Sequence, residues 1–169
     1  MRLKATPSRR RLAVSAALLL LLSLPARADT IDQRASLQGL PGVTVMMDAI
    51  GPPYGREALA IPDLQAAVEL RLRQHGIRVL TEATGVLSLK VTTTRDDVDA
   101  YAVHLALRLL QVARLERKLK RPMQLLLSTW DAEALLLVAP ADFLRVVQPK
   151  AIDLVDRFIN AYLDQNPAR

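Results

Sequence analysis

Residues 86–92 read Val-Leu-Ser-Leu-Lys-Val-Thr, and this alternation of apolar and polar side chains decides the fold. Successive side chains of a β-strand point to opposite faces of a sheet, so Leu87, Leu89 and Val91 would share one face. The residues between them are polar and would lie on the other face. The pattern therefore predicts a strand with one buried and one solvated face.

Upstream of this strand, Thr84 and Gly85 are typical of a turn, and Ile77 and Val79 read as an earlier strand. Two short strands that are joined at such a turn form a β-hairpin. We therefore expect a hairpin over residues 77–91, with one face exposed to solvent.

The clearest helix of the chain precedes this hairpin. Leu64, Val68 and Leu72 recur every four residues, which places them on one face of a helix. Pro62 suits the first turn of a helix, and Gly76 suits its carboxy-terminal cap. These signals predict a helix that begins at Pro62 and ends before Gly76.

Three shorter segments lie before that helix. Residues 29–38 are polar with scattered apolar residues and predict a flexible leader. Residues 39–42 read Gly-Leu-Pro-Gly, which is typical of a turn. The β-branched residues that follow predict a buried strand over 43–47, ended by Gly51 and two prolines.

Residues 101–117 fit both a strand and a helix. Leu105, Leu109 and Val112 lie near helical spacing, and Ala, Leu and Arg favour helices. An alternating set favours a strand instead, and consists of Tyr101, Val103, Leu105, Leu107 and Leu109. We prefer the strand, which would need a β-bulge at Leu109 and Leu110 to keep one face buried.

The remaining sequence predicts one or two strands and a long helix. Residues 124–138 read as a strand or a hairpin, and Asp142 is a favourable cap for the helix after it. Pro149 should kink this helix or begin its second part, and Asn166 and Pro167 end it. One broad apolar face is formed by Val147, Ala151, Val155, Phe158 and Tyr162.

Taken in order, these elements predict an α+β fold. Two helices would cover one face of an antiparallel sheet of about four to five strands. Residues 39–169 would form a single globular domain.

The amino terminus resembles a secretory signal peptide. A basic start is followed by 13 uncharged residues, 12–24, and then by Ala26-Arg27-Ala28, a small-x-small cleavage site. The apolar run is shorter than the roughly 20 residues that a membrane-spanning helix needs. We expect cleavage after Ala28, no membrane span in the product, and a periplasmic or secreted protein. The general secretory route fits better than the twin-arginine route, which Arg9-Arg10-Arg11 only loosely resembles.

Removal of residues 1–28 changes the charge of the protein. The whole chain has a net charge of +6, but this segment holds six of the 23 Lys and Arg residues and none of the 17 acidic residues. The remainder has 17 charges of each sign, so an electrostatic argument for nucleic-acid binding fails. The chain has no cysteine, which excludes disulfides, thiolate metal sites and a lipid-modified cysteine within it.

Few residues have the types that catalysis or metal binding requires. The two histidines, His75 and His104, are too few for a three-histidine zinc site, and His75 suits a structural contact at a helix end. Three aspartates at 96, 97 and 99 could hold calcium, but they lack the spacing of a known calcium loop, and a solvated turn is favoured. No cofactor-binding motif occurs, so we expect no cofactor and no metal.

The candidate contact residues fall into two groups. A basic patch, which consists of Arg114, Arg117, Lys118, Lys120 and Arg121, could touch an anionic glycolipid or form an ordinary charged loop. Trp130 and Asp131 could form a partner surface, although a single Trp in a strand usually packs in a core. The alternative is a hydrolase of unknown substrate, which would bring His104 and Asp131 together.

Several stretches, taken together, look like small exported bacterial proteins of unassigned function; they are Leu37 to Val43, Val68 to Leu72, Gly76 to Val79, Thr129 to Asp131, Leu154 to Asn160 and Asn166-Pro167. This resemblance implies no catalytic residue. The order of elements is also similar to that of small envelope modules, namely the amino-terminal domain of TolB and the lipopolysaccharide-assembly lipoproteins. The resemblance implies an interaction or binding module of the bacterial cell envelope, with an envelope protein or a glycolipid as its partner.

Overall fold

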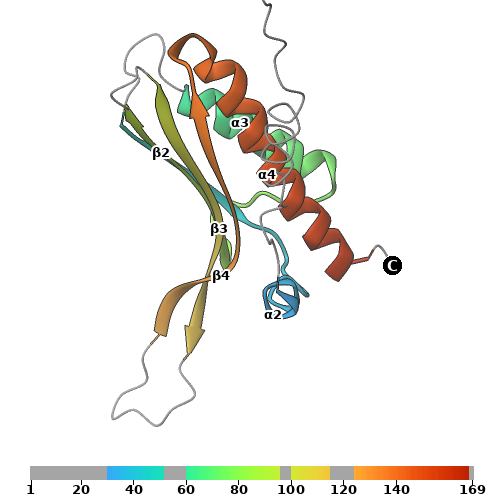
Figure 1. The fold of residues 1–169 in the computed structure, drawn as a ribbon. Coiled ribbons are helices and arrows are strands. Elements are labelled where there is room, and N and C mark those ends of the chain that lie inside the picture. The colour runs from blue at the N-terminus through green and yellow to red at the C-terminus, as the bar shows by residue number, and fades with distance from the viewer. Residues whose placement is uncertain (1–29, 52–59, 96–99, 115–123, 168–169) are drawn as a thin grey trace, which may run out of the picture.

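The computed structural model describes residues 30–51, 60–95, 100–114 and 124–167. The expected α+β class is confirmed, because a four-stranded sheet packs against helices on one face (Figure 1). The elements in chain order are α2 (Ile31–Ala35), β1 (Thr44–Ile50), α3 (Ile61–Gln74), β2 (Gly85–Arg95), β3 (Tyr101–Arg114), β4 (Gln124–Val138), the 3-10 turn η3 (Pro140–Asp142) and α4 (Phe143–Gln165).

The sheet is mixed rather than wholly antiparallel. Its order is β1-β2-β3-β4, and β2, β3 and β4 are antiparallel to their neighbours. Strand β1 is parallel to β2, because α3 carries the chain back between them so that both strands run in the same direction. The two edges of the sheet are therefore β1 and β4.

Strand β2 confirms the alternation at residues 86–92. Leu87, Leu89 and Val91 are each at most 2% exposed, whereas Lys90 is exposed. The expected hairpin partner at Ile77 and Val79 is wrong. That segment pairs with the residue before β1 instead, because Val43 N–H donates to the Arg78 carbonyl at 2.9 Å and forms a single parallel bridge with Val79.

The ambiguous segment at residue 101 is a strand. β3 runs to Arg114, and the register with β4 shifts between Leu109 and Leu110, where a bulge was needed. The unpaired residue lies on the other strand, since Trp130 pairs with Leu109 and Ser128 pairs with Leu110. Thr129, which lies between them, donates a hydrogen bond through Oγ1 to Gln111 Oε1 at 2.6 Å.

Helix α4 packs against strands β3 and β4. Four of the five residues predicted for its apolar face are buried, and Tyr162 is half-buried. Pro149 does not divide the helix. The proline removes one intrahelical hydrogen bond, but Val147 and Ala151 on either side of it are fully buried, and this packing stabilises a continuous helix.

The amino-terminal segment before β1 differs from the expected irregular leader. Residues 31–35 of the segment expected as a flexible leader form the helix α2, which Thr30 and Gln33 close with a capping box. Leu37 is fully buried in the main core, because α2 packs against both α4 and β4.

Strand β1 was expected to be buried. Within it only Val45 is buried, because β1 is an edge strand whose outer side has no neighbour in the sheet. It ends at Gly51, where any side chain would collide with the Thr93 carbonyl of β2.

The burial of Leu37 gives a test of where the domain begins. Leu37→Ala should lower the free energy of unfolding by about 2–5 kcal/mol, because it leaves a cavity in the core. Leu70→Ala, at a position 55% exposed on α3, is the matched control and should change it by at most about 0.5 kcal/mol. Equal, small effects in urea unfolding would contradict the placement of α2 in the domain.

Candidate functional site

The candidate site is the face of the sheet that no described helix covers. Helices α3 and α4 lie on the same side of the sheet, so alternate residues of each strand point to the other side (Figure 1). The middle of this open face is polar and carries Ser88, Lys90, Thr92, His104, Arg108 and Glu133.

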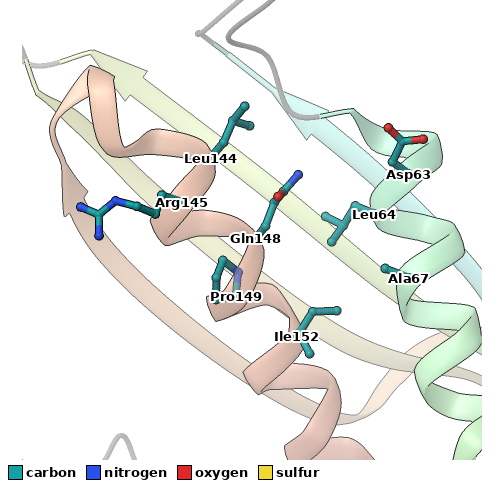
Figure 2. Close-up of a pocket in the computed structure, with 8 residues that line it drawn as sticks. All are labelled: Asp63, Leu64, Ala67, Leu144, Arg145, Gln148, Pro149 and Ile152. Carbon is teal, nitrogen blue, oxygen red and sulfur yellow. The ribbon is translucent and has the colours of Figure 1, made fainter.

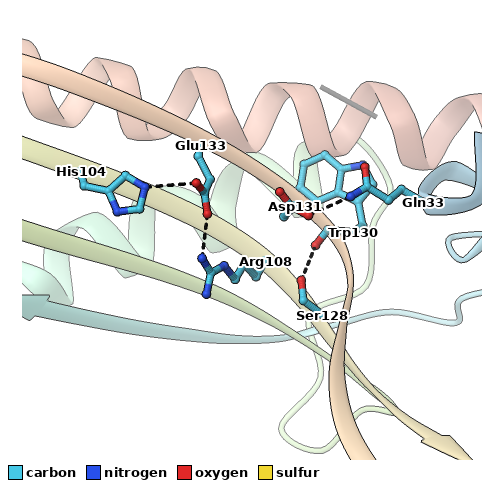
Figure 3. A network of polar contacts seen from close by, with 7 residues as sticks. All are labelled: Gln33, His104, Arg108, Ser128, Trp130, Asp131 and Glu133. Atoms are coloured by element: carbon cyan, nitrogen blue, oxygen red, sulfur yellow. Dashed lines mark hydrogen bonds and ion pairs between the residues drawn. The ribbon is translucent and has the colours of Figure 1, made fainter. Parts of the chain in front are cut away.

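An ionic cluster lies in this polar middle (Figure 3). Arg108 donates to Glu133 Oε1 at 2.7 Å, and His104 Nε2 lies 3.2 Å from Glu133 Oε2. The three side chains are between 41% and 48% exposed, so solvent screens the pair interactions. The hydrogen bonds hold the three side chains in place on the open face. Because all three are partly exposed, we expect the cluster to contribute no more to stability than an ordinary surface ion pair.

The carboxyl of Glu133 has a lowered pKa. The hydrogen bond from Arg108 is the largest cause, partial desolvation opposes it, and the hydrogen bond and charge of His104 lower the pKa further. Glu133 is therefore a stable anion at neutral pH and is a poor proton donor there.

The structure does not bring His104 and Asp131 together. In the register of β3 and β4, His104 is opposite Leu135, and Asp131 is opposite Arg108. Four residues of a strand separate these positions by about 13 Å. Asp131 accepts a hydrogen bond from Gln33 at 2.8 Å, and the ring of His104 meets Glu133. The pair required for the hydrolase is thus absent from this arrangement.

Trp130 belongs to the core and not to the surface. Its side chain is fully buried and packs edge-on against Phe158 of α4, with ring centroids 5.2 Å apart. The indole Nε1–H has no hydrogen-bond partner among the described residues. Trp130 is consequently not available as a contact surface, in contrast to the expectation from sequence.

Within the sheet, most of the exposed large apolar side chains lie on the two edge strands, β1 and β4. Leu135 and Leu137 of β4 are 77% and 70% exposed, and Met46 and Ile50 lie on β1 at the other edge. Sequence reasoning missed the two leucines, because both alternating sets of residues 132–138 are apolar except for Glu133. The short alanines at 132 and 134 are the signal that could have indicated the helix-facing side.

Strands β3 and β4 also project beyond the helices as a hairpin (Figure 1). Val112 and Leu126 are opposite each other on it and are 62% and 58% exposed. Arg114 is exposed at the last described position of β3. The other members of the basic patch, and the three aspartates at 96–99, lie outside the described residues, so both remain predictions.

A separate groove of about 590 Å³ lies between α3 and α4 (Figure 2). Its lining is mainly apolar, with Asp63, Arg145 and Gln148 at its polar positions. Arg145 is already bound to Asp142 at 2.8 Å. The other histidine, His75, places Nδ1 2.8 Å from the Arg71 carbonyl at the end of α3, which is the structural contact expected of it.

The described part of the chain lacks both a metal-binding cluster and a membrane-spanning helix. It holds no group of three or more residues placed to bind a metal ion. None of its helices is both long enough and apolar enough to span a bilayer.

Comparison with known proteins gives a match in structure alone. The crystal structure of rare lipoprotein B from Shewanella oneidensis matches with a TM-score of 0.33 and 14% sequence identity, over 74% of this chain and 96% of that one. No protein-family model matches the chain, and no curated protein matches its sequence.

The lowered pKa of Glu133 predicts how the cluster contributes to stability. A carboxylate with a lowered folded-state pKa stabilises the protein above its ordinary pKa, and the contribution is lost as pH falls through the folded value. Glu133→Gln should therefore reduce stability at pH 7 by less than about 1 kcal/mol. The difference should narrow as pH falls below 4.5.

Urea unfolding of the two proteins at several pH values measures this difference. Arg108→Ala serves as the background control, in which the same Gln substitution should have a smaller effect. A difference that grows in acid would contradict the assigned ion pair.

Proposed function

We propose that this protein is an exported interaction module of the bacterial cell envelope, which binds a partner protein along the β4 edge. The observation that carries the proposal is the exposure of Leu135 and Leu137 on an edge strand. Adjacent exposed leucines on a free strand edge are a feature that proteins otherwise avoid, because such edges pair with other chains.

The edge supports this function better than the middle of the open face. A partner that lies flat on the sheet would have to cover Lys90, Arg108 and Glu133, and the desolvation of these charges is costly. A partner that lies beside β4 would cover the leucines and leave the ionic cluster in water. The apolar area and the free backbone groups therefore point to addition of a strand.

The features of the amino terminus support export. A basic start, a short apolar run and the Ala26-Arg27-Ala28 site together are typical of a cleaved signal. The balanced charge of the remainder favours a protein partner over a nucleic acid. The separation of His104 from Asp131 supports a function in binding rather than hydrolysis.

Site-specific photo-crosslinking in cells tests the proposed surface. A photoreactive residue at position 135 should form crosslinks to protein that depend on light. The matched control is position 70, which is 55% exposed on α3 and should give none. Crosslinking of equal strength from both positions, or none from position 135, would remove the β4 edge from the account. Fractionation of the same cells should place the crosslinked protein outside the cytoplasm.

A further inference from the structure

The β4 edge is protected near its bulge by the chain itself. At the bulge, Ser36 Oγ donates to the Thr129 carbonyl at 3.1 Å, and Gln33 binds the Asp131 side chain. Bulges and covering segments are the usual devices that prevent edge strands from pairing. Within the described ranges, residues 132–138 carry neither device, and nothing hydrogen-bonds to their outward backbone.

We propose that this unprotected stretch pairs with a second copy of the same chain. The two β4 strands would run antiparallel about a twofold axis at Leu136 and would form one continuous sheet of eight strands. This inference rests on the proposed function, because it names the partner that the β4 edge takes.

The exposed side chains match in this register. With Leu136 on the axis, Leu135 of each copy lies opposite Leu137 of the other, so four leucines form one cluster across the junction. Directly opposed side chains of an antiparallel pair lie about 4.5–5.5 Å apart at Cβ and stabilise the sheet when both are apolar. The two most exposed apolar side chains of the sheet would thus cover each other.

On the helix-facing side of the junction, the paired side chains of the two copies are complementary in size. Ala134 would lie opposite Val138 of the second copy, so a small side chain meets a larger one at both ends of the pairing. Leu136, which is half-buried against the core, would meet its own copy on the axis. The small alanines leave room for the larger residues of the second chain.

The charges are compatible with this register. Glu133 would lie opposite Ala139 of the second copy, so no carboxylates face each other. Its own carboxylate is already bound by Arg108 and His104, and these contacts lie on the β3 side, away from the junction. The chain without residues 1–28 also has a net charge of zero, so two copies do not repel each other overall.

The length of the pairing predicts a weak dimer. Pro140 lacks a backbone N–H and begins η3, so it ends the pairable strand beyond Val138. Five residue pairs, 134–138, would remain. A ladder of this size is smaller than the roughly 1,200–2,000 Å² that stable interfaces bury. Association should therefore depend on concentration.

Sedimentation velocity of the protein produced from its full sequence tests the pairing. From about 1 µM to 1 mM, the parent protein should shift from monomer to dimer. The double variant Leu135→Lys, Leu137→Lys should associate at least about tenfold more weakly. Leu70→Lys adds a charge at an exposed position of α3 and should sediment as the parent does.

The absence of native cysteine allows a test of the register. A mixture of Leu135→Cys and Leu137→Cys proteins should form disulfide-linked dimers under mild oxidation, because these positions oppose each other. Neither protein alone should link, since two residues of offset place like positions farther apart than about 7 Å, beyond the reach of a disulfide. Both leucines are largely exposed, so their substitution should leave the fold intact.

The outcomes separate this inference from the proposed function. A parent protein that stays monomeric throughout, with no linkage in the mixture, overturns self-pairing. If position 135 still photo-crosslinks another protein, the β4 edge binds a different partner and the proposed function stands. If position 135 crosslinks nothing either, both are overturned.

Discussion

The packing of α4 against one face of the sheet, centred on the edge-to-face contact of Trp130 with Phe158, is the interaction on which the rest of the structure depends. Both side chains are fully buried, and a buried aromatic pair contributes about 0.5–1.5 kcal/mol beyond its area. Because α3 packs on the same side, the sheet has one closed and one open face. The chain that connects α2 to β1 joins the same core through Leu37.

This one-sided packing determines what the rest of the sheet can do. The middle of the open face is polar and needs no cover, since its ionic cluster is solvated. The edges differ from the middle, because no described strand lies beyond β4, and β4 carries exposed leucines. The segment that includes α2 hydrogen-bonds to β4 at Thr129 and at Asp131. The proposed contact surface is therefore an edge strand rather than a cleft.

The sequence predicts those elements whose signals are local. The alternation of Leu87, Leu89 and Val91 identifies β2, and the four-residue spacing of Leu64, Val68 and Leu72 identifies α3. Likewise, the phase change at Leu109 and Leu110 indicates the irregularity between β3 and β4. The parallel pairing of β1 depends on where α3 returns the chain, and no local pattern encodes this.

The candidate site was harder to predict for a related reason. Residues 132–138 are apolar on both alternating sides, so periodicity cannot show which leucines are exposed. Trp130 is the only Trp of the chain, which made it a candidate contact residue, but its large apolar side chain is buried in the core. The ordered contacts of the segment before β1 depend on Leu37 and Ser36 meeting distant parts of the chain.

Amide hydrogen exchange along β4 tests the central claim that residues 132–138 form a free edge. In dilute protein, amides that bond to β3 should exchange slowly, and the alternate, outward amides should exchange rapidly. The outward set should become protected as the edge is occupied at high concentration. Slow exchange of every amide in this stretch in dilute protein would contradict the free edge. Rapid exchange of the outward set at all concentrations would leave the free edge standing and would contradict self-pairing.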